Sequence, residues 1–133
     1  MTQEEKQLLI KDLCAKFPYG VKAELHGEVC TVLGYYNDFD FDDFVILTSN
    51  TPTGQQTNIA NIKPYLRPMS SMTEEEEKVF NDFLEFQAEY VSDADLDNKT
   101  DMYDWFNAHH FDYRGLIPMG LAIEAPDDMY KTE

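Results

Sequence analysis

Five aspartates lie close together at a spacing that could bind a metal ion. Asp93, Asp95 and Asp97 are followed by Asp101 and Asp104, which gives positions 1, 3, 5, 9 and 12 of a twelve-residue segment. An EF-hand loop places its oxygen ligands for calcium at these positions. One hypothesis is therefore an EF-hand-like calcium-binding loop between two helices.

Segment 93–104 departs from that motif at three places. Asn98 stands where glycine makes the sharp turn, Thr100 where an apolar residue is expected, and Asp104 where a longer glutamate binds calcium with both oxygens. In a chain with 26 acidic residues, such a run also arises by chance. The alternative is a solvated acidic connector whose last aspartates stabilise the start of the next helix. We favour the connector and predict no metal ligand.

A second pattern, His109, His110 and Asp112, could serve acid–base chemistry in an enzyme. Neighbouring side chains on a helix point about 100° apart, so the two imidazoles are poorly placed to bind one ion. A helix C-terminus explains the same residues, with His109 packed near Trp105 and a protonated His110 or Arg114 at the negative end of the helix dipole. No nucleophile accompanies the pattern. We therefore predict no catalytic residue and no cofactor, and an enzyme is the less favoured hypothesis.

The wider segment 73–104 is the most acidic part of the chain. It holds twelve carboxylates and two lysines, a formal charge of −10 in a chain of −16. This charge repels phosphate backbones and anionic lipids, so we expect neither direct nucleic-acid binding nor membrane binding. The favoured hypothesis is a non-enzymatic interaction or accessory protein that binds a basic partner protein, and nucleic-acid mimicry is one form of it. The candidate binding face consists of acidic residues: Asp82, Glu85, Glu89, Asp93, Asp95 and Asp97.

The length and composition predict one folded domain spanning residues 1–133. Apolar residues make up 43 % of the chain, which is too many for a disordered acidic tail. The N-terminus lacks a cationic stretch before an apolar run, and no apolar run approaches the length of a membrane span. Cys14 and Cys30 lack metal-ligand spacing and are expected to behave as small buried hydrophobes. We expect a cytoplasmic location, and the sequence does not predict an oligomeric state.

The fold predicted for the first half is a helix followed by a small antiparallel sheet. Residues 1–17 form the helix, because Thr2 and Glu5 make a capping box and an apolar face follows, formed by Leu9, Ile10, Leu13, Cys14 and Phe17. Residues 21–68 form the β portion, with a tight hairpin at Gly27 and further strands at 44–48 and 55–59. The two prolines in 62–68 indicate an edge strand at most. The number of short strands is typical of an SH3-like barrel.

Residues 73–110 are predicted to form two helices, which makes the class α+β. Thr73 caps a helix whose first turn holds four glutamates. Its buried face is expected to include Val79, Phe83, Phe86 and Tyr90. The second helix is predicted from Asp101 to about His110, after a connector at 92–99. Residues 111–133 are expected to pack on the body as an extended tail.

Two segments carry a resemblance to a known group of proteins. IKPYLRPMSSMTEEE at 62–76 and HHFDYRGLIPMGLAIEAP at 109–126 resemble a family of small uncharacterised proteins of gut anaerobic bacteria and their mobile elements. The resemblance implies no particular activity. It favours an accessory intracellular protein.

Overall fold

The structure is a computed structural model that describes residues 2–38, 43–49, 55–89, 93–126 and 129–130. At 38, 43, 55, 86–89 and 93–100 it describes the backbone alone. Helix α1 (Gln3–Lys16) is followed by a sheet, and then by helices α2 (Glu74–Glu89) and α3 (Asp93–Ala108). This order gives the α+β class that the sequence predicts.

The sheet has six strands in the spatial order β4-β3-β2-β1-β5-β6. The strand bounds are β1 (Lys22–Leu25), β2 (Glu28–Asp38), β3 (Asp43–Thr48), β4 (Gln55–Asn58), β5 (Ile62–Leu66) and β6 (Ile123–Glu124). The pairs are antiparallel except for β5 with β6, which is parallel. The described strands form an open sheet with β4 and β6 at its edges, so an SH3-like barrel is not confirmed.

The hairpin between β1 and β2 turns at the predicted place. Leu25 pairs with Glu28, which leaves His26 and Gly27 as a two-residue turn. Their φ angles are 53° and 81°. Positive φ at both central positions gives the turn the twist that matches paired strands, and glycine adopts it without steric cost.

Strand β5 corrects the expectation of an edge segment. It pairs with β1 along one side, where Ala23 faces Pro64, and with β6 on the other. The parallel pairing with β6 involves Tyr65 and Leu66, which follow Pro64. A proline is tolerated here because the second set of ladder hydrogen bonds begins beyond it.

The main hydrophobic core lies between α1 and one face of the sheet. Leu9 and Leu13 are fully buried and Ile10 nearly so, while Cys14 and Phe17 are half-buried, which confirms the predicted apolar face. Inner-facing strand residues meet this face of the helix, among them Ala23, Leu25, Val32, Ile46 and Ile62. Burial of this face stabilises α1 more than its helix propensity does.

The tail after α3 packs on the body, as expected. Leu116 and Leu121 join the same core. The hydroxyl of Tyr130 accepts a hydrogen bond from the backbone N–H of Lys22 and donates one to the carbonyl of Tyr65, at 2.9 and 2.7 Å. These bonds hold Tyr130 against β1 and β5.

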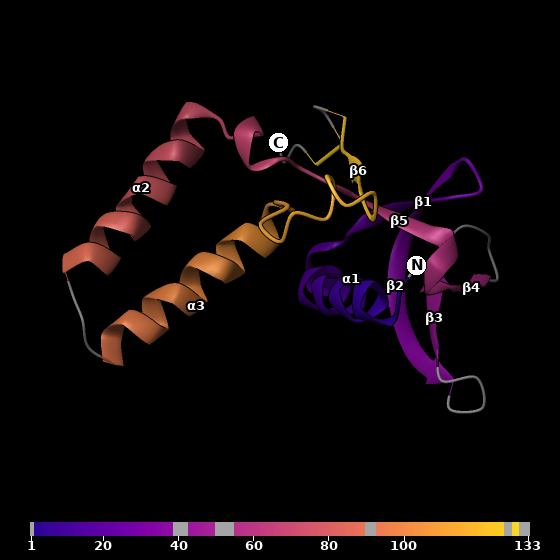
Figure 1. The fold of residues 1–133 in the computed structure, drawn as a ribbon. Coiled ribbons are helices and arrows are strands. Elements are labelled where there is room, and N and C mark those ends of the chain that lie inside the picture. Colours follow the sequence, from indigo (N-terminus) through magenta and orange to yellow (C-terminus); the bar gives the residue numbers. More distant parts are fainter. Residues whose placement is uncertain (1, 39–42, 50–54, 90–92, 127–128, 131–133) are drawn as a thin grey trace.

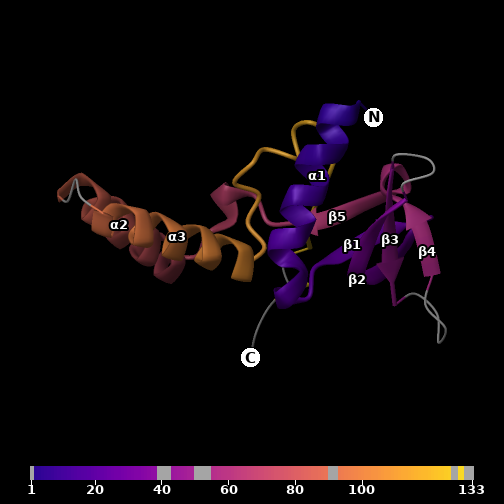
Figure 2. The same cartoon turned by 90° about the horizontal axis from the view of Figure 1, so that it is seen from below.

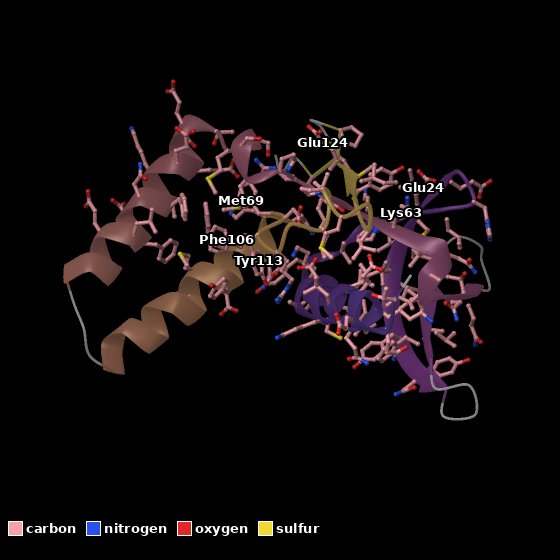
Figure 3. The ribbon with its side chains drawn as sticks, viewed as in Figure 1. Glu24, Lys63, Met69, Phe106, Tyr113 and Glu124 are labelled. Carbon is pink, nitrogen blue, oxygen red and sulfur yellow. The ribbon has the colours of Figure 1, made fainter. Side chains whose placement is uncertain are left out.

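Helices α2 and α3 form an arm that projects away from the sheet (Figure 1). In both views α1 lies between the arm and the sheet (Figure 2). Figure 3 shows Met69, Phe106 and Tyr113 at the root of this arm, well separated from Glu24 and Lys63 on the sheet. Among the described residues, no helix has the length and apolarity needed to cross a lipid bilayer.

Candidate functional site

The first helix of the arm begins where the sequence predicts. Thr73 Oγ1 accepts a hydrogen bond from the backbone N–H of Glu76 at 3.2 Å, and Glu76 Oε1 accepts one from the N–H of Thr73 at 2.9 Å. This is a capping box, which satisfies two backbone donors that the first helical turn leaves free. The carboxylates of the first turn also stabilise the positive end of the helix dipole.

The two helices meet through a second, smaller hydrophobic core at the arm root. Met102, Phe106 and Phe111 are its buried members. Phe80 and Phe83 of α2 contact Phe106 and Trp105 of α3, with ring centroids 5.6 and 6.0 Å apart. Aromatic pairs at these separations add stability beyond their burial.

The predicted buried face of α2 is correct only in part. Phe83 packs against α3 as expected, but the predicted Val79 is 39 % exposed. Leu84, next to Phe83, is also 43 % exposed. Each helix of the arm packs mainly on the other helix, so it buries a narrower stripe of side chains than a helix packed on a sheet does. The predicted contacts of Phe86 and Tyr90 lie outside the described side chains. The arm therefore presents apolar as well as acidic side chains to solvent.

The acidic residues predicted for the binding face all lie on the arm. Asp82 and Glu85 are exposed on α2. Asp101 and Asp104, which were candidates only in the calcium hypothesis, are exposed on α3. The side chains of four further candidates lie outside the described set: Glu89, Asp93, Asp95 and Asp97. Residues three or four positions apart share one helical face, so Asp82 and Glu85 lie on one face of α2.

The predicted connector before the second helix is wrong. Helix α3 begins at Asp93 rather than at Asp101. Asp93 and Asp95 thus lie in the first helical turn, where aspartates stabilise the positive end of the helix dipole. The helix also satisfies backbone N–H and C=O groups that a connector would expose to water.

This helix also removes the loop that the calcium hypothesis requires. An EF-hand curls its backbone around one ion, whereas the backbone from Asp93 is helical and rises about 1.5 Å per residue. Among residues with described side chains, no three His, Cys, Asp or Glu converge as metal ligands. Calcium binding is therefore not proposed.

One arginine ties the arm to the end of β5. Arg67 Nη1 and Nη2 donate to the two carboxylate oxygens of Glu76 at 2.8 and 2.6 Å, and the guanidinium lies 4.4 Å from the ring centroid of Phe111. The bond to Arg67 lowers the pKa of Glu76 to about 2. We call the pair of Arg67 and Glu76 the Arg67 clasp. It neutralises one of the four glutamates in the first turn of α2.

The histidine pattern is divided among three separate structural roles. His109 lies beside Trp105, with centroids 5.0 Å apart, and its Nδ1 is 3.2 Å from Glu76 Oε2. Burial lowers the pKa of His109, and the nearby Glu76 carboxylate opposes this shift. Asp112 accepts hydrogen bonds from the backbone N–H groups of Leu116 and Ile117 at 2.8 and 2.9 Å, so its carboxylate organises the tail.

His110 differs from the expected cation at the helix end. Its side chain is 5 % exposed, and its ring stacks on Tyr130 with centroids 3.7 Å apart. Burial lowers the pKa of His110 to about 4, so the ring is neutral at neutral pH. Arg114 does not serve the helix end either, because its Nε donates to Asp12 on α1 at 3.2 Å.

A hollow lies beside the arm root, between the start of α2 and the tail. Its volume is about 490 Å³, and its lining includes the carboxylates of Glu75, Glu76 and Glu124 with the side chains of Arg67 and Tyr130. Glu76 neutralises Arg67, so the remaining charge of these five residues is negative. The hollow therefore extends the acidic surface of the arm toward the body.

A buried polar cluster that sequence reasoning missed joins α1 to the arm. Asp12, Lys16 and Asn107 are all buried. A signal for the first two was present, because Asp12 and Lys16 fall on the same helical face as Leu9 and Leu13. Charged residues on an apolar face indicate a buried pair, whereas Asn107 gave no comparable signal.

Comparison with known proteins gives no match, whether to protein-family models, to curated proteins or to solved structures. The resemblance of 62–76 and 109–126 to proteins of gut anaerobes stays a prediction. The site is therefore defined by its own geometry: a projecting, two-helix, acidic arm with exposed apolar side chains.

Proposed function

We propose that the protein is a non-enzymatic interaction protein that binds a basic surface of a partner protein through the α2–α3 arm. The observation that carries the proposal is the placement of the charge. Residues 73–104 hold −10 of the formal charge of −16, and the helices that carry it project from the body (Figure 1). A protein that needed charge for solubility alone could spread it over the whole surface.

The chemistry of the arm supports a protein partner. Exposed carboxylates attract Lys and Arg and speed association at low salt. The exposed Val79, Leu84 and Tyr103 add apolar contact area, which a bare cation would not use. The acidic hollow at the arm root suits a Lys or Arg side chain from the same partner.

Nucleic-acid mimicry is the form of binding that we favour. On one helical face, carboxylates three or four residues apart have Cβ atoms about 5–6 Å apart. A row of negative charges at this spacing can occupy a basic groove that otherwise binds a phosphate backbone. A partner of this kind binds nucleic acid through a surface that the arm covers.

The test captures partners with two matched variants. The arm variant carries Asp82→Asn, Glu85→Gln and Asp104→Asn. The body variant carries Glu4→Gln, Glu24→Gln and Glu28→Gln, which removes the same charge from α1 and the β1–β2 hairpin. Each protein is immobilised and exposed to a lysate of the source organism at low salt, and the retained proteins are identified and purified.

A purified basic protein should bind the wild type and the body variant with similar affinity, and the arm variant about tenfold more weakly. Its affinity should fall steeply with salt, and duplex DNA should compete with the arm for it. If the arm and body variants lose affinity equally, the arm is not the binding site. If binding is specific to the arm but DNA does not compete, mimicry is wrong and the interaction stands.

A further inference from the structure

Three polar side chains meet in the interior where α1 passes the arm root. Lys16 of α1 is fully buried, and its Nζ lies 2.6 Å from Asp12 Oδ1 and 3.1 Å from Asn107 Oδ1. Asp12 belongs to the same helix, whereas Asn107 belongs to α3 and is 91 residues away in sequence. One ammonium group therefore connects the body to the arm.

Two residues that follow α3 complete the cluster. Arg114 Nε donates to Asp12 Oδ1 at 3.2 Å, and its Nη2 donates to the Tyr113 hydroxyl at 3.0 Å. The Lys16 ammonium lies 4.8 Å from the centroid of the Tyr113 ring. The side chain of Asn107 also hydrogen-bonds the Tyr113 hydroxyl. The five residues form one connected network.

This network lies between the two hydrophobic cores. On one side, Leu9 and Leu13 of α1 belong to the core under the sheet. On the other side, Phe106 belongs to the arm-root core, and Tyr113 stacks on it with centroids 5.4 Å apart (Figure 3). Apolar contacts alone would hold these surfaces together at many similar angles, because such contacts are not directional.

We propose that the network of Asp12, Lys16, Asn107, Tyr113 and Arg114 is a joint that fixes the angle of the arm relative to the sheet. Burial of a charged pair is a weak source of stability, because desolvation offsets the attraction. Hydrogen bonds of fixed geometry select one arrangement instead, which is the best attested use of buried polar groups. Asn107 is the critical member, since it links α3 to Lys16.

The joint does not depend on the proposed partner. It is a property of the free protein, and its failure can be measured without any partner. Its consequence for binding is that the arm presents its charges in one direction, so that less conformational freedom is lost on association.

The experiment measures the distance between the arm and the sheet. Spin labels are placed at Glu85→Cys on α2 and Lys63→Cys on β5, in a background of Cys14→Ser and Cys30→Ala, and the distance distribution is recorded by double electron–electron resonance. Two test variants are made: Asn107→Leu, which cuts the cross-link, and Asp12→Leu with Lys16→Met and Asn107→Leu, which replaces the buried polar side chains with apolar ones. Lys11→Met is the control, because Lys11 is exposed on the same helix.

The labelled parent and Lys11→Met should give one narrow distribution. Asn107→Leu and the triple variant should widen it by about twofold while far-ultraviolet circular dichroism stays unchanged, because the helices persist and only their angle is released. If the triple variant does not fold, Asn107→Leu decides the question. A width equal to that of the parent would overturn the proposal and leave the Arg67 clasp as the element that sets the angle.

Discussion

Among the four consecutive glutamates at the start of α2, one is structural and three face solvent. Glu76 is bound by Arg67 and by the backbone of Thr73, and its pKa is lowered to about 2. Glu74, Glu75 and Glu77 are exposed. Adjacent residues of the same type thus have different roles, because a helix turns each of them toward a different neighbour.

The pH dependence of stability is expected to come in part from His110. Its pKa is about 4 in the folded protein, below the ordinary value of about 6.5 that the unfolded chain retains. Between these values the unfolded chain binds a proton that the folded protein does not. The contribution of His110 to stability is therefore complete above about pH 6.5, and is lost as the pH falls toward about 4.

The prediction compares His110→Asn with the wild type by urea unfolding at several pH values. Asparagine tolerates the positive φ of 60° at this position and does not titrate. The free energy of unfolding of the wild type, relative to that of the variant, should fall by about 2 kcal/mol between about pH 7 and about pH 4.5. His26→Asn is the control, since His26 also has a positive φ, of 53°, and is exposed. Parallel pH curves for wild type and His110→Asn would show that the buried ring does not resist protonation.

At the scale of elements, α1 and α2 begin with the same capping box in different settings. Thr2 and Glu5 cap α1, which is packed on the sheet. Thr73 and Glu76 cap α2, which packs on α3 alone within the arm. An element with one neighbour has fewer buried contacts, so the arm is expected to open as a unit of its own before the body unfolds.

Substitution of the two caps tests this separation. Thr73→Ala should lower the free energy of opening the arm by about 1 kcal/mol. Amide hydrogen exchange in α2 and α3 should then become about fivefold faster, while exchange in α1 stays unchanged. Thr2→Ala should destabilise α1, and the whole body with it, by a similar amount. The measurement is native-state hydrogen exchange followed by mass spectrometry. Equal acceleration of α1 and α2 in the Thr73→Ala variant would contradict independent opening of the arm.

For the whole molecule, the charge of −16 opposes folding through self-repulsion. The fold gathers most of this charge on the projecting arm, where dissolved ions can screen the exposed carboxylates (Figure 1). This repulsion should therefore depend on the salt concentration.

Salt should stabilise this protein. Raising sodium chloride from about 20 mM to about 500 mM shortens the screening length and should raise the melting temperature by about 5 °C, measured by calorimetry. The arm variant described above should show a smaller rise, because part of the repulsion is already gone. A melting temperature that stays constant or falls with salt would mean that attractive ion pairs outweigh the repulsion.

The sequence alone determined the features that depend on near neighbours. The caps at Thr2 and Thr73, the turn at Gly27 and the apolar face of α1 each depend on residues within about one helical turn or one hairpin loop. The charge of segment 73–104 also follows from the sequence, and with it the acidic residues of the candidate site.

The tertiary structure decided what depends on distant partners. The interior position of β5 requires β6, which is more than fifty residues later in the chain. The aspartates that the sequence places in a connector belong to α3, which begins at Asp93. The projection of the arm is likewise visible only in the tertiary structure. The buried Lys16 ammonium pairs with the nearby Asp12, but its second hydrogen bond goes to Asn107, 91 residues away. Local sequence patterns do not predict such contacts, because these contacts form only when the chain closes long loops during folding.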